Sequence, residues 1–345
     1  MSAINFVVIG YGGMGAYHVH NIMPNENERI HIVGTYDISE ERQAISQEKG
    51  HKIYKSYEEV LADETIEAVL IATPNDLHKD LSIAALQAGK HVVCEKPVAL
   101  NTAELDEIVA VAKETGNTFM VHQNRRWDPD FLLVRDLYRN GQIGDLFQIE
   151  SRVQGANGIP GDWRHVKKQG GGMVLDWGVH LLDQMLWLID SPVKDVKADL
   201  SYILGEEVDD GFFTLITFEN GVKAIVEVGT SNYTQLPRWY IKGIEGTATI
   251  QDWDLNGEMV RATGREDVAA PKPVQAGVGL TKTMAPPSEL AAESLPFPEV
   301  KADFDPFYKN FYHVVRDGAE PIVKNEEVRN VMVLIERIFE VAGAK

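Results

Sequence analysis

Two ionisable side chains lie four residues apart in a segment that is otherwise apolar. Asp176 and His180 occur within residues 173–188, whose pattern predicts a helix buried on most of its circumference. Residues four apart share one face of an α-helix, so the acid and the histidine are expected to act together. They could perform general acid–base chemistry, form a helix-surface pair or supply two metal ligands. The motif offers no third ligand, which favours acid–base chemistry without a metal.

A lysine follows a second buried segment. Residues 91–94 form an apolar run that predicts a strand and contains the single cysteine, Cys94, and Lys96 comes two residues later. Pro97 keeps the local chain extended, so the Lys96 ammonium is expected to point into a crevice. A cation placed there can stabilise negative charge that develops on a reacting oxygen.

A glycine-rich turn near the N-terminus predicts a dinucleotide site. The spacing of Gly10, Gly12 and Gly15 directly after an apolar strand is the dinucleotide-binding fingerprint. A second predicted strand, residues 30–36, ends in Asp37, where an acid binds the adenosine ribose hydroxyls. Such an acid repels a ribose phosphate, so NAD is expected rather than NADP. The other turn residues expected at the cofactor are Tyr11, Gly13 and Met14.

Short strands and helices alternate as far as residue 122, which predicts a doubly wound parallel sheet. Ligands bind beyond the carboxyl ends of such strands. Polar residues follow the predicted strands at those ends. They lie in the segments Thr73-Pro74-Asn75, Glu95-Lys96-Pro97 and Gln123-Asn124-Arg125-Arg126.

The pattern changes after Arg126, and from residue 197 the chain is rich in strands. We therefore expect an α/β protein of two domains. Residues 1–124 would form the Rossmann domain, and residues 125–345 an α+β domain with an open, mainly antiparallel sheet. Residues 264–303 contain six prolines and predict a long loop or flap, followed by helices over 305–317 and 326–342.

The composition narrows the class of protein. The 345 residues carry a formal net charge of −19, which argues against nucleic acid as a partner. No apolar run is long enough for a membrane span, and the N-terminal residues lack the order of a signal peptide, so a cytoplasmic location is expected. A single cysteine excludes an intrachain disulfide and a multi-cysteine zinc site.

Taken together, the motifs GYGGMG, ATPNDLH, CEKP, GGGMVLDWGVHLLD and YIKGIEGTATI resemble the glucose-fructose oxidoreductase and inositol dehydrogenase family, Gfo/Idh/MocA. The resemblance covers nearly the whole chain. It implies an N-terminal Rossmann domain, oxidoreduction of sugars or cyclitols with NAD or NADP, and homodimers or homotetramers that associate through the C-terminal sheet.

Residue by residue, the resemblance makes Lys96, Asp176 and His180 the catalytic group. It places Trp163 and Arg164 near the cofactor and the substrate. Besides the glycine turn and Asp37, the expected cofactor contacts are Thr73, Pro74, Asn75, His78, Glu95, Lys96 and Asn124. The expected substrate contacts are Lys96, Arg126, Trp163, Asp176 and His180. His122 and His165 stay without a functional assignment.

Oxidation of a carbinol requires loss of the hydroxyl proton as the hydride leaves. Histidine has the pKa suited to that proton, so His180 is the expected general base. Lys96 would stabilise the developing alkoxide, and Asp176 would orient and polarise the site. The favoured substrate is a sugar, glycoside or cyclitol oxidised at a ring carbon, with C3 of a glucoside as one form. The alternatives are inositol dehydrogenation, glycoside cleavage through transient oxidation, and a non-catalytic NAD-sensing regulator.

Overall fold

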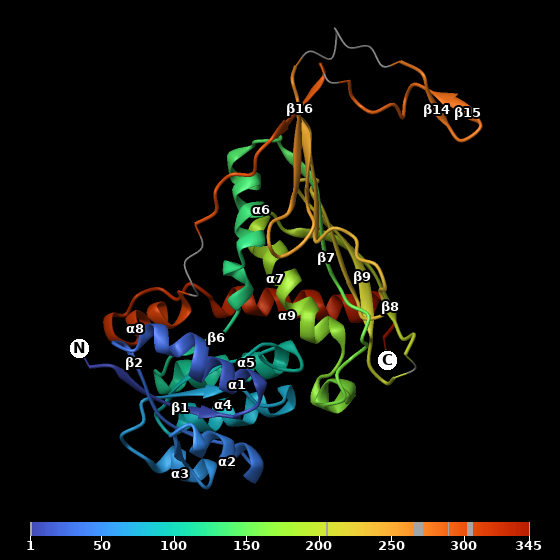
Figure 1. The fold of residues 1–345 in the computed structure, drawn as a ribbon. Coiled ribbons are helices and arrows are strands. Elements are labelled where there is room, and N and C mark those ends of the chain that lie inside the picture. Colours follow the sequence, from blue (N-terminus) through green and yellow to red (C-terminus); the bar gives the residue numbers. More distant parts are fainter. Residues whose placement is uncertain (1, 205, 265–271, 289, 302–305, 345) are drawn as a thin grey trace.

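Six parallel strands form the first sheet, in the order β3-β2-β1-β4-β5-β6 (Figure 1). The computed structural model describes residues 2–204, 206–264, 272–288, 290–301 and 306–344. All four residues of β4 are buried, as expected of a strand covered by helices on both faces. The predicted doubly wound Rossmann sheet is therefore confirmed. Its strands are β1 (Ile4–Ile9), β2 (Ile30–Tyr36), β3 (Lys52–Ile53), β4 (Ala68–Ile71), β5 (His91–Cys94) and β6 (Phe119–Val121).

The helices between these strands begin at capping residues that the sequence supplies. The Asn101 side chain accepts a hydrogen bond from the amide of Glu104 at 3.0 Å and starts α5, which ends at Gly116. The helix predicted over 76–88 opens with a 3₁₀ turn, η3 (Asn75–Leu77), a common form of helix N-terminus. The helices are α1 (Gly13–Tyr17), η1 (His18–Ile22), η2 (Met23–Glu26), α2 (Glu40–Glu48), α3 (Tyr57–Ala62), α4 (His78–Gln87) and α5 (Thr102–Thr115).

The second sheet has eight strands in the order β16-β13-β12-β11-β7-β10-β9-β8. Among the described strands of this second sheet, only β7 and β10 pair in parallel, so the predicted mainly antiparallel sheet is confirmed. The strands are β7 (Leu146–Gln154), β8 (Val193–Ser201), β9 (Gly211–Phe218), β10 (Lys223–Gly229), β11 (Trp239–Gly243), β12 (Gly246–Ile250), β13 (Gly257–Ala262) and β16 (Ala292–Leu295).

One face of this sheet is covered by helices and the other is open. Along β9, Phe212, Thr214 and Ile216 are buried, whereas Phe213 between them is 44% exposed. This alternation is that of an antiparallel sheet with one solvated face. The helices of this domain are α6 (Pro129–Asn140), α7 (Val179–Leu188) and α9 (Asn325–Val341).

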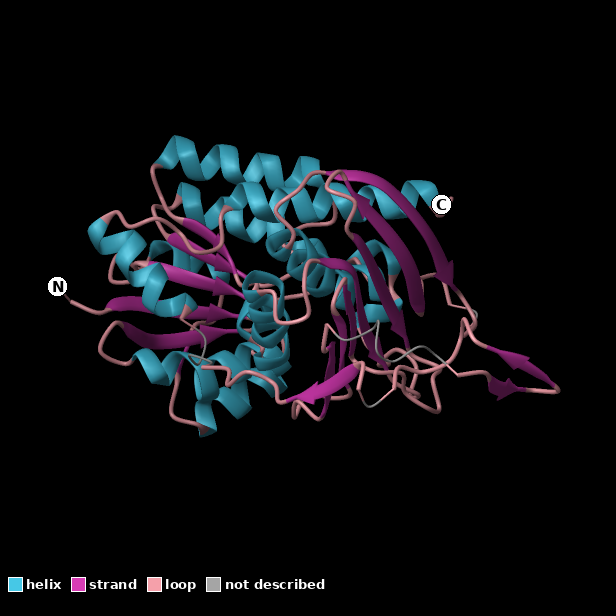
Figure 2. Cartoon of the chain, turned by 90° about the horizontal axis from the view of Figure 1, so that it is seen from above, coloured by secondary structure: helices cyan, strands magenta, loops and turns pink. Residues whose placement is uncertain are grey.

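The segment predicted as a flap forms a projecting arm and an edge strand instead of one long loop. Strands β14 (Val274–Ala276) and β15 (Gly279–Thr281) make a separate two-stranded hairpin. This hairpin extends beyond the rest of the ribbon in both views (Figures 1 and 2). The chain then returns as β16 and pairs with β13. Residues 265–271, 289 and 302–303 of the predicted flap lie outside the described residues.

The C-terminal helices pack against the first domain as well as the second. In α8 (Phe307–Asp317), the rings of Tyr308 and Phe311 lie 5.9 and 5.4 Å from the ring of Phe6 in β1. From α9, the Glu336 carboxylate accepts a hydrogen bond from the amide of Thr102 at 2.7 Å. One helix of the predicted second domain, α8, thus lies on the Rossmann domain (Figure 1). Asp305, where the sequence predicted that helix to begin, lies outside the described residues.

Among the described residues, no helix combines the length and the apolar composition that crossing a bilayer would require.

Candidate active site

A cavity of about 760 Å³ lies at the carboxyl ends of β1, β2, β4 and β5. Its opposite wall comes from the second domain, through Asp162, Trp163, Arg164 and Asp176. This is the position at which open α/β sheets bind ligands. Of the residues predicted from the sequence, those that line the cavity are Gly10, Gly12, Gly13, Met14, Asp37, Thr73, Pro74, Asn75, Glu95, Lys96, Trp163, Arg164 and Asp176.

The glycine turn has the shape that a dinucleotide requires. A Cβ on Gly15 would stand 1.8 Å from the carbonyl oxygen of Gly10, so only glycine allows the helix to pack on the strand. A Cβ on Gly12 or Gly13 would meet no atom within 4 Å, which leaves that backbone open toward the cavity. The turn therefore fits the pyrophosphate of a nicotinamide dinucleotide. Tyr11 is buried, and its contribution is the backbone amide, which donates to Asp37 Oδ2 at 2.7 Å.

The predicted ribose acid has a cationic neighbour. Asp37 is fixed by the amides of Tyr11 and Ser39, at 2.7 and 2.8 Å, and lines the cavity. Arg42, from the first turn of α2, lines the same part of the cavity. The acid disfavours a 2′-phosphate and the arginine favours one, so the two residues have opposite effects on the choice between NAD and NADP.

Lys96 and Asp176 come together across the two domains. Lys96 Nζ lies 3.2 Å from Asp176 Oδ1 and donates to the Asp176 carbonyl at 3.1 Å. Arg164 Nε donates to the other carboxylate oxygen at 3.3 Å. Burial alone would raise the pKa of Asp176, but Lys96 and Arg164 outweigh it and hold that pKa below its usual value. The Asp176 carboxylate therefore lies between two cations, the Lys96 ammonium and the Arg164 guanidinium.

The helix that carries Asp176 and His180 begins with a π-turn, η7 (Val174–Gly178), and continues as α7. A π-turn closes i→i+5 hydrogen bonds and adds a residue to the turn that separates Asp176 from His180. Asp176 lines the cavity and His180 does not. The charge of Lys96, which pairs with Asp176, nevertheless acts on His180. His180 is 5% exposed, and its ring lies 6.0 Å from the Trp177 ring in an edge-on contact.

The surroundings of His180 favour its neutral form. Burial is the main cause that lowers its pKa well below the usual value, and the charges of Lys96 and Arg125 add to it. Its Nδ1 has no hydrogen-bond partner among the described residues. A neutral imidazole with a free ring nitrogen can accept a proton, as a general base must.

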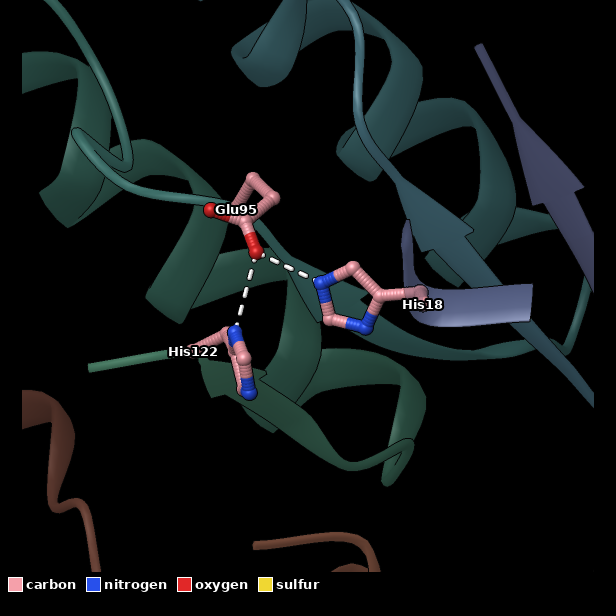
Figure 3. A group of neighbouring side chains, drawn as sticks. All are labelled: His18, Glu95 and His122. Carbon is pink, nitrogen blue, oxygen red and sulfur yellow. Dashed lines mark hydrogen bonds and ion pairs between the residues drawn. The ribbon is translucent and has the colours of Figure 1, made fainter. Parts of the chain in front are cut away.

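Two buried histidines, His18 and His122, hold the carboxylate of Glu95 (Figure 3). The Oε1 atom of Glu95 forms hydrogen bonds with His18 Nε2 at 2.7 Å and with His122 Nδ1 at 2.9 Å. Its Oε2 atom accepts a hydrogen bond from the backbone amide of Lys96 at 3.2 Å. Burial opposes the charge, but the hydrogen bonds from His122 and His18 hold the pKa of Glu95 well below its usual value. The ring nitrogens of the two histidines and the carboxylate oxygen of Glu95 are also atoms that could act as ligands of a metal ion. Their short separations are nevertheless those of hydrogen bonds, and they make Glu95 a fixed anion that positions Lys96.

Two predicted cofactor residues, His78 and Asn124, do not line the cavity. His78 is buried, with Nδ1 2.8 Å from the Pro97 carbonyl and Nε2 3.0 Å from the Thr73 carbonyl, so it steadies two lining segments. Asn124 begins η4 (Asn124–Trp127) and is not among the residues that line the cavity. The amide of Asn75, which does line it, donates to the Gly170 carbonyl of the second domain at 2.9 Å.

The structure corrects the prediction for Arg126. Its guanidinium is buried and forms two hydrogen bonds to Asp183, at 2.7 and 2.6 Å, and one to Glu327, at 2.6 Å. Arg126 does not line the cavity, so it ties η4 to α7 and α9 and is not placed to bind a substrate.

Sequence reasoning missed several residues near the site. Arg42 and Asp162 line the cavity, and Arg125 packs over the Trp177 ring with 4.4 Å between guanidinium carbon and ring centroid. Asp162 stood in the sequence beside Trp163 and Arg164, a signal that could have identified it. Arg42 offered no such signal, because a charge in the first turn of a helix usually faces water.

Two family profiles match the chain one after the other. Residues 4–123 match the oxidoreductase family with an NAD-binding Rossmann fold, and residues 131–249 match the GFO/IDH/MocA C-terminal domain. The chain belongs to the Gfo/Idh/MocA family. The family resemblance is thereby confirmed. This Gfo/Idh/MocA protein is an oxidoreductase with a nicotinamide cofactor, of the class that dehydrogenates CH–OH groups.

Named relatives span a range of similarity. The scyllo-inositol 2-dehydrogenase (NADP(+)) of Bacillus subtilis is 28% identical, over 100% of this chain and 95% of its own. An uncharacterized oxidoreductase of Schizosaccharomyces pombe is 36% identical, but over only 56% of this chain and 53% of its own. The crystal structure of an NAD-binding protein from Listeria innocua superposes with a TM-score of 0.95 at 56% identity, over 99% of this chain and 98% of that one.

Proposed function

We propose that this protein is an NAD-dependent dehydrogenase that oxidises a ring hydroxyl of a sugar, glycoside or cyclitol, with C3 of a glucoside as one candidate position. The observation that carries the proposal is the Lys96–Asp176 pair, at 3.2 Å, in the wall of the dinucleotide cavity beside a buried, neutral His180. When bound, the nicotinamide supplies the hydride acceptor.

The residues divide the remaining work. His180 accepts the hydroxyl proton, because burial and the neighbouring cations keep its imidazole neutral. Lys96 donates to the substrate oxygen and stabilises charge as that proton leaves. Asp176 and Glu95 hold the Lys96 ammonium and backbone, respectively, in position.

The preference for NAD rests on Asp37, whose carboxylate repels a ribose phosphate. Arg42 acts in the other direction, and the Bacillus subtilis relative is named for NADP(+). Kinetics with both cofactors and the Asp37→Asn variant test this preference. We expect the ratio of NAD to NADP activity to exceed one in the wild type and to fall in the variant. A wild type that prefers NADP would overturn the choice of cofactor.

The experiment that tests the function follows NADH formation with purified protein, NAD or NADP, and a panel of free sugars, glycosides and inositols. Lys96→Met should lose most turnover, roughly 10²-fold or more, and should still bind NAD by calorimetry. Lys55→Met is the matched control, since Lys55 is exposed and does not line the cavity. Normal turnover in Lys96→Met would contradict the assignment.

Inositol dehydrogenation is the second candidate, favoured by relatives named as inositol dehydrogenases, among them one from Thermotoga maritima that is 29% identical over 64% of this chain. Turnover of an inositol but of no glycoside in the panel would select it. Cleavage of a glycoside without net NADH would instead indicate transient oxidation. Binding of NAD without turnover across the panel would indicate a regulator.

We propose that the protein works in the cytoplasm as a homodimer or homotetramer that associates through the open face of the second sheet. The exposed Phe213 on that face and the apolar arm residues Val278, Leu280 and Met284 support an association between copies. The net charge of −19 supports a small-molecule substrate rather than nucleic acid.

A further inference from the structure

An aromatic strip leads away from the helix that carries Asp176 and His180. Trp177 directly follows Asp176, and its ring contacts the ring of His180. The Trp253 ring lies 6.3 Å from the Trp177 ring, although the two residues come from different parts of the chain. Trp253 stands in the loop between β12 and β13 and is 45% exposed. This aromatic strip therefore consists of His180, Trp177 and Trp253, and it ends at the partly exposed indole of Trp253.

The loop that carries Trp253 is ordered by its own hydrogen bonds. Asp252 Oδ1 accepts from the amides of Asp254 and Asn256 at 3.0 and 3.2 Å, and Asp252 Oδ2 accepts from the Asn256 side chain at 2.8 Å. An exposed aromatic ring on an ordered loop loses little conformational freedom when a ligand packs on it.

Two arginines border this ring. The guanidinium carbon of Arg238 lies 4.6 Å from the Trp253 ring centroid, and that of Arg125 lies 5.4 Å from it. Arg238 is only 4% exposed, and its Nη2 has no hydrogen-bond partner among the described residues. Arg125 Nε is likewise without one. Buried donors of this kind are normally satisfied, so a ligand or water that accepts hydrogen bonds is expected here.

A second, small cavity of about 70 Å³ opens beside Trp253. Polar side chains dominate its lining, among them Arg238, Arg152, Gln154, Gln235 and Gln251. The volume is too small for a sugar ring and is enough for hydroxyl or hydroxymethyl groups at the edge of one. A ring that packs on Trp253 can thus place its polar edge against these donors.

Building on the proposed dehydrogenase function, we infer that Trp253, Arg238 and the small cavity form a subsite for the second unit of a glycoside. The first ring, which is oxidised, lies at Lys96 and Asp176. The second unit, a further sugar or a flat aglycone, stacks on Trp253, two ring-to-ring steps of about 6 Å from His180. A free inositol has no unit to place there.

The test compares wild type, Trp253→Ala and Trp253→Phe with methyl glucoside, phenyl glucoside, a glucose disaccharide and myo-inositol. Phenyl glucoside and the disaccharide carry a second unit, and methyl glucoside does not. In Trp253→Ala we expect kcat/KM for the two larger compounds, relative to kcat/KM for methyl glucoside, to fall about tenfold, mostly through a higher KM. Trp253→Phe should restore most of that ratio. Tyr233→Ala, which removes an aromatic ring that is 91% exposed elsewhere, is the matched control and should leave the ratio unchanged. A ratio that is the same in Trp253→Ala and wild type would overturn the subsite while the dehydrogenase function stands.

Calorimetry with the same compounds gives a readout that needs no turnover. If none of the compounds is oxidised, binding of phenyl glucoside or the disaccharide that weakens in Trp253→Ala supports the subsite and rejects the proposed reaction. Binding that is equal in both proteins overturns the subsite. Loss of phenyl glucoside binding alone identifies an aromatic aglycone as the second unit, and loss of disaccharide binding alone identifies a sugar.

Discussion

At the scale of single residues, His180 and Lys96 illustrate how burial sets the available protonation states. His180 sits among cations in a buried position, so its pKa lies well below the ordinary value, chiefly because of burial. It therefore stays neutral at pH 7 and below. A base of this kind is always ready to accept a proton in the physiological range, at the cost of low basicity.

This environment makes a prediction for the pH profile. Turnover should stay flat as the pH falls through 6.5, the usual range for histidine, and should decline only at lower pH, where His180 becomes protonated and can no longer accept a proton. His180→Asn should reduce turnover strongly and remove that acid limb. Profiles of kcat for the two proteins provide the measurement. A wild-type limb centred at or above pH 6.5 would contradict the role of His180.

Arg126 leads to a prediction about stability rather than catalysis. Replacing it by methionine leaves the buried Asp183 carboxylate without its partner, and breaking a buried ion pair in this way destabilises a protein by roughly 3–5 kcal/mol. Denaturant unfolding of Arg126→Met with the matched Arg126→Lys measures the loss. Since Arg126 does not line the cavity, KM at a temperature where the variant is folded should stay close to wild type. A large increase in KM with normal stability would restore Arg126 as a substrate ligand.

Much of the site could be predicted because its residues sit next to strong local signals. Lys96 and Asp37 follow apolar strands, and Asp176 follows a glycine run. The contacts that complete the site join residues far apart in sequence, as where Glu95 meets His18 and His122, which lie 77 and 27 positions away. No local pattern contains such pairs, so His18 and His122 could not be connected with Glu95 from the sequence.

At the scale of elements, the start of the helix that carries Asp176 and His180 is the least ordinary feature. The alternation of short strands and helices in the first domain follows from local apolar patterns, and the sequence predicted the parallel sheet that results. The π-turn of η7 does not follow in this way, because it depends on what packs around it. Gly172 has a φ of +102°, and a Cβ there would stand 2.3 Å from Asp209 Oδ1, so the glycine makes room for that carboxylate.

Asp209 in turn caps the π-turn, with Oδ2 accepting from the amide of Val174 at 2.8 Å. Burial is the main cause that raises the pKa of Asp209 to about 6. In the unfolded chain this acid ionises near pH 4, so between about pH 4 and 6 the folded state holds a proton that the unfolded state has lost. Asp209 ionisation therefore lowers stability as the pH rises through this window.

Asp209→Asn should remove this dependence, because the amide oxygen can still accept from Val174 and carries no charge. We expect the free energy of unfolding of the variant, minus that of wild type, to grow from pH 4 to 6 by up to roughly 3 kcal/mol and then to level off. Urea unfolding at several pH values measures it, and Glu219→Gln, at an exposed carboxylate, is the control. A difference that does not vary with pH would contradict the raised pKa.

At the scale of the whole molecule, the second sheet leaves one broad face without a covering layer. The sequence predicted this open sheet from alternating strands. It did not predict the arm, because proline-rich segments lack the periodicity from which elements are recognised. The open face and the projecting arm together give one copy considerable apolar surface to share with another.

Phe213→Glu tests the proposed assembly. A charge in a buried interface is costly, so we expect the wild type to run as a dimer or tetramer in light scattering after gel filtration and the variant to shift toward smaller species. Val333→Glu is the matched control, since Val333 in α9 is 42% exposed and does not belong to the open sheet face. Identical masses for wild type and Phe213→Glu would argue against association through this face.

The packing of α8 on β1 also bears on how the protein is made. The rings of Tyr308 and Phe311 cover Phe6, which comes from the beginning of the chain. A ribosome that has released the Rossmann strands has yet to release these aromatic residues, so part of the core of the nucleotide domain stays uncovered until Tyr308 and Phe311 have been synthesised. Chains truncated before α8 should consequently engage chaperones, even though every strand and glycine of their cofactor site is present.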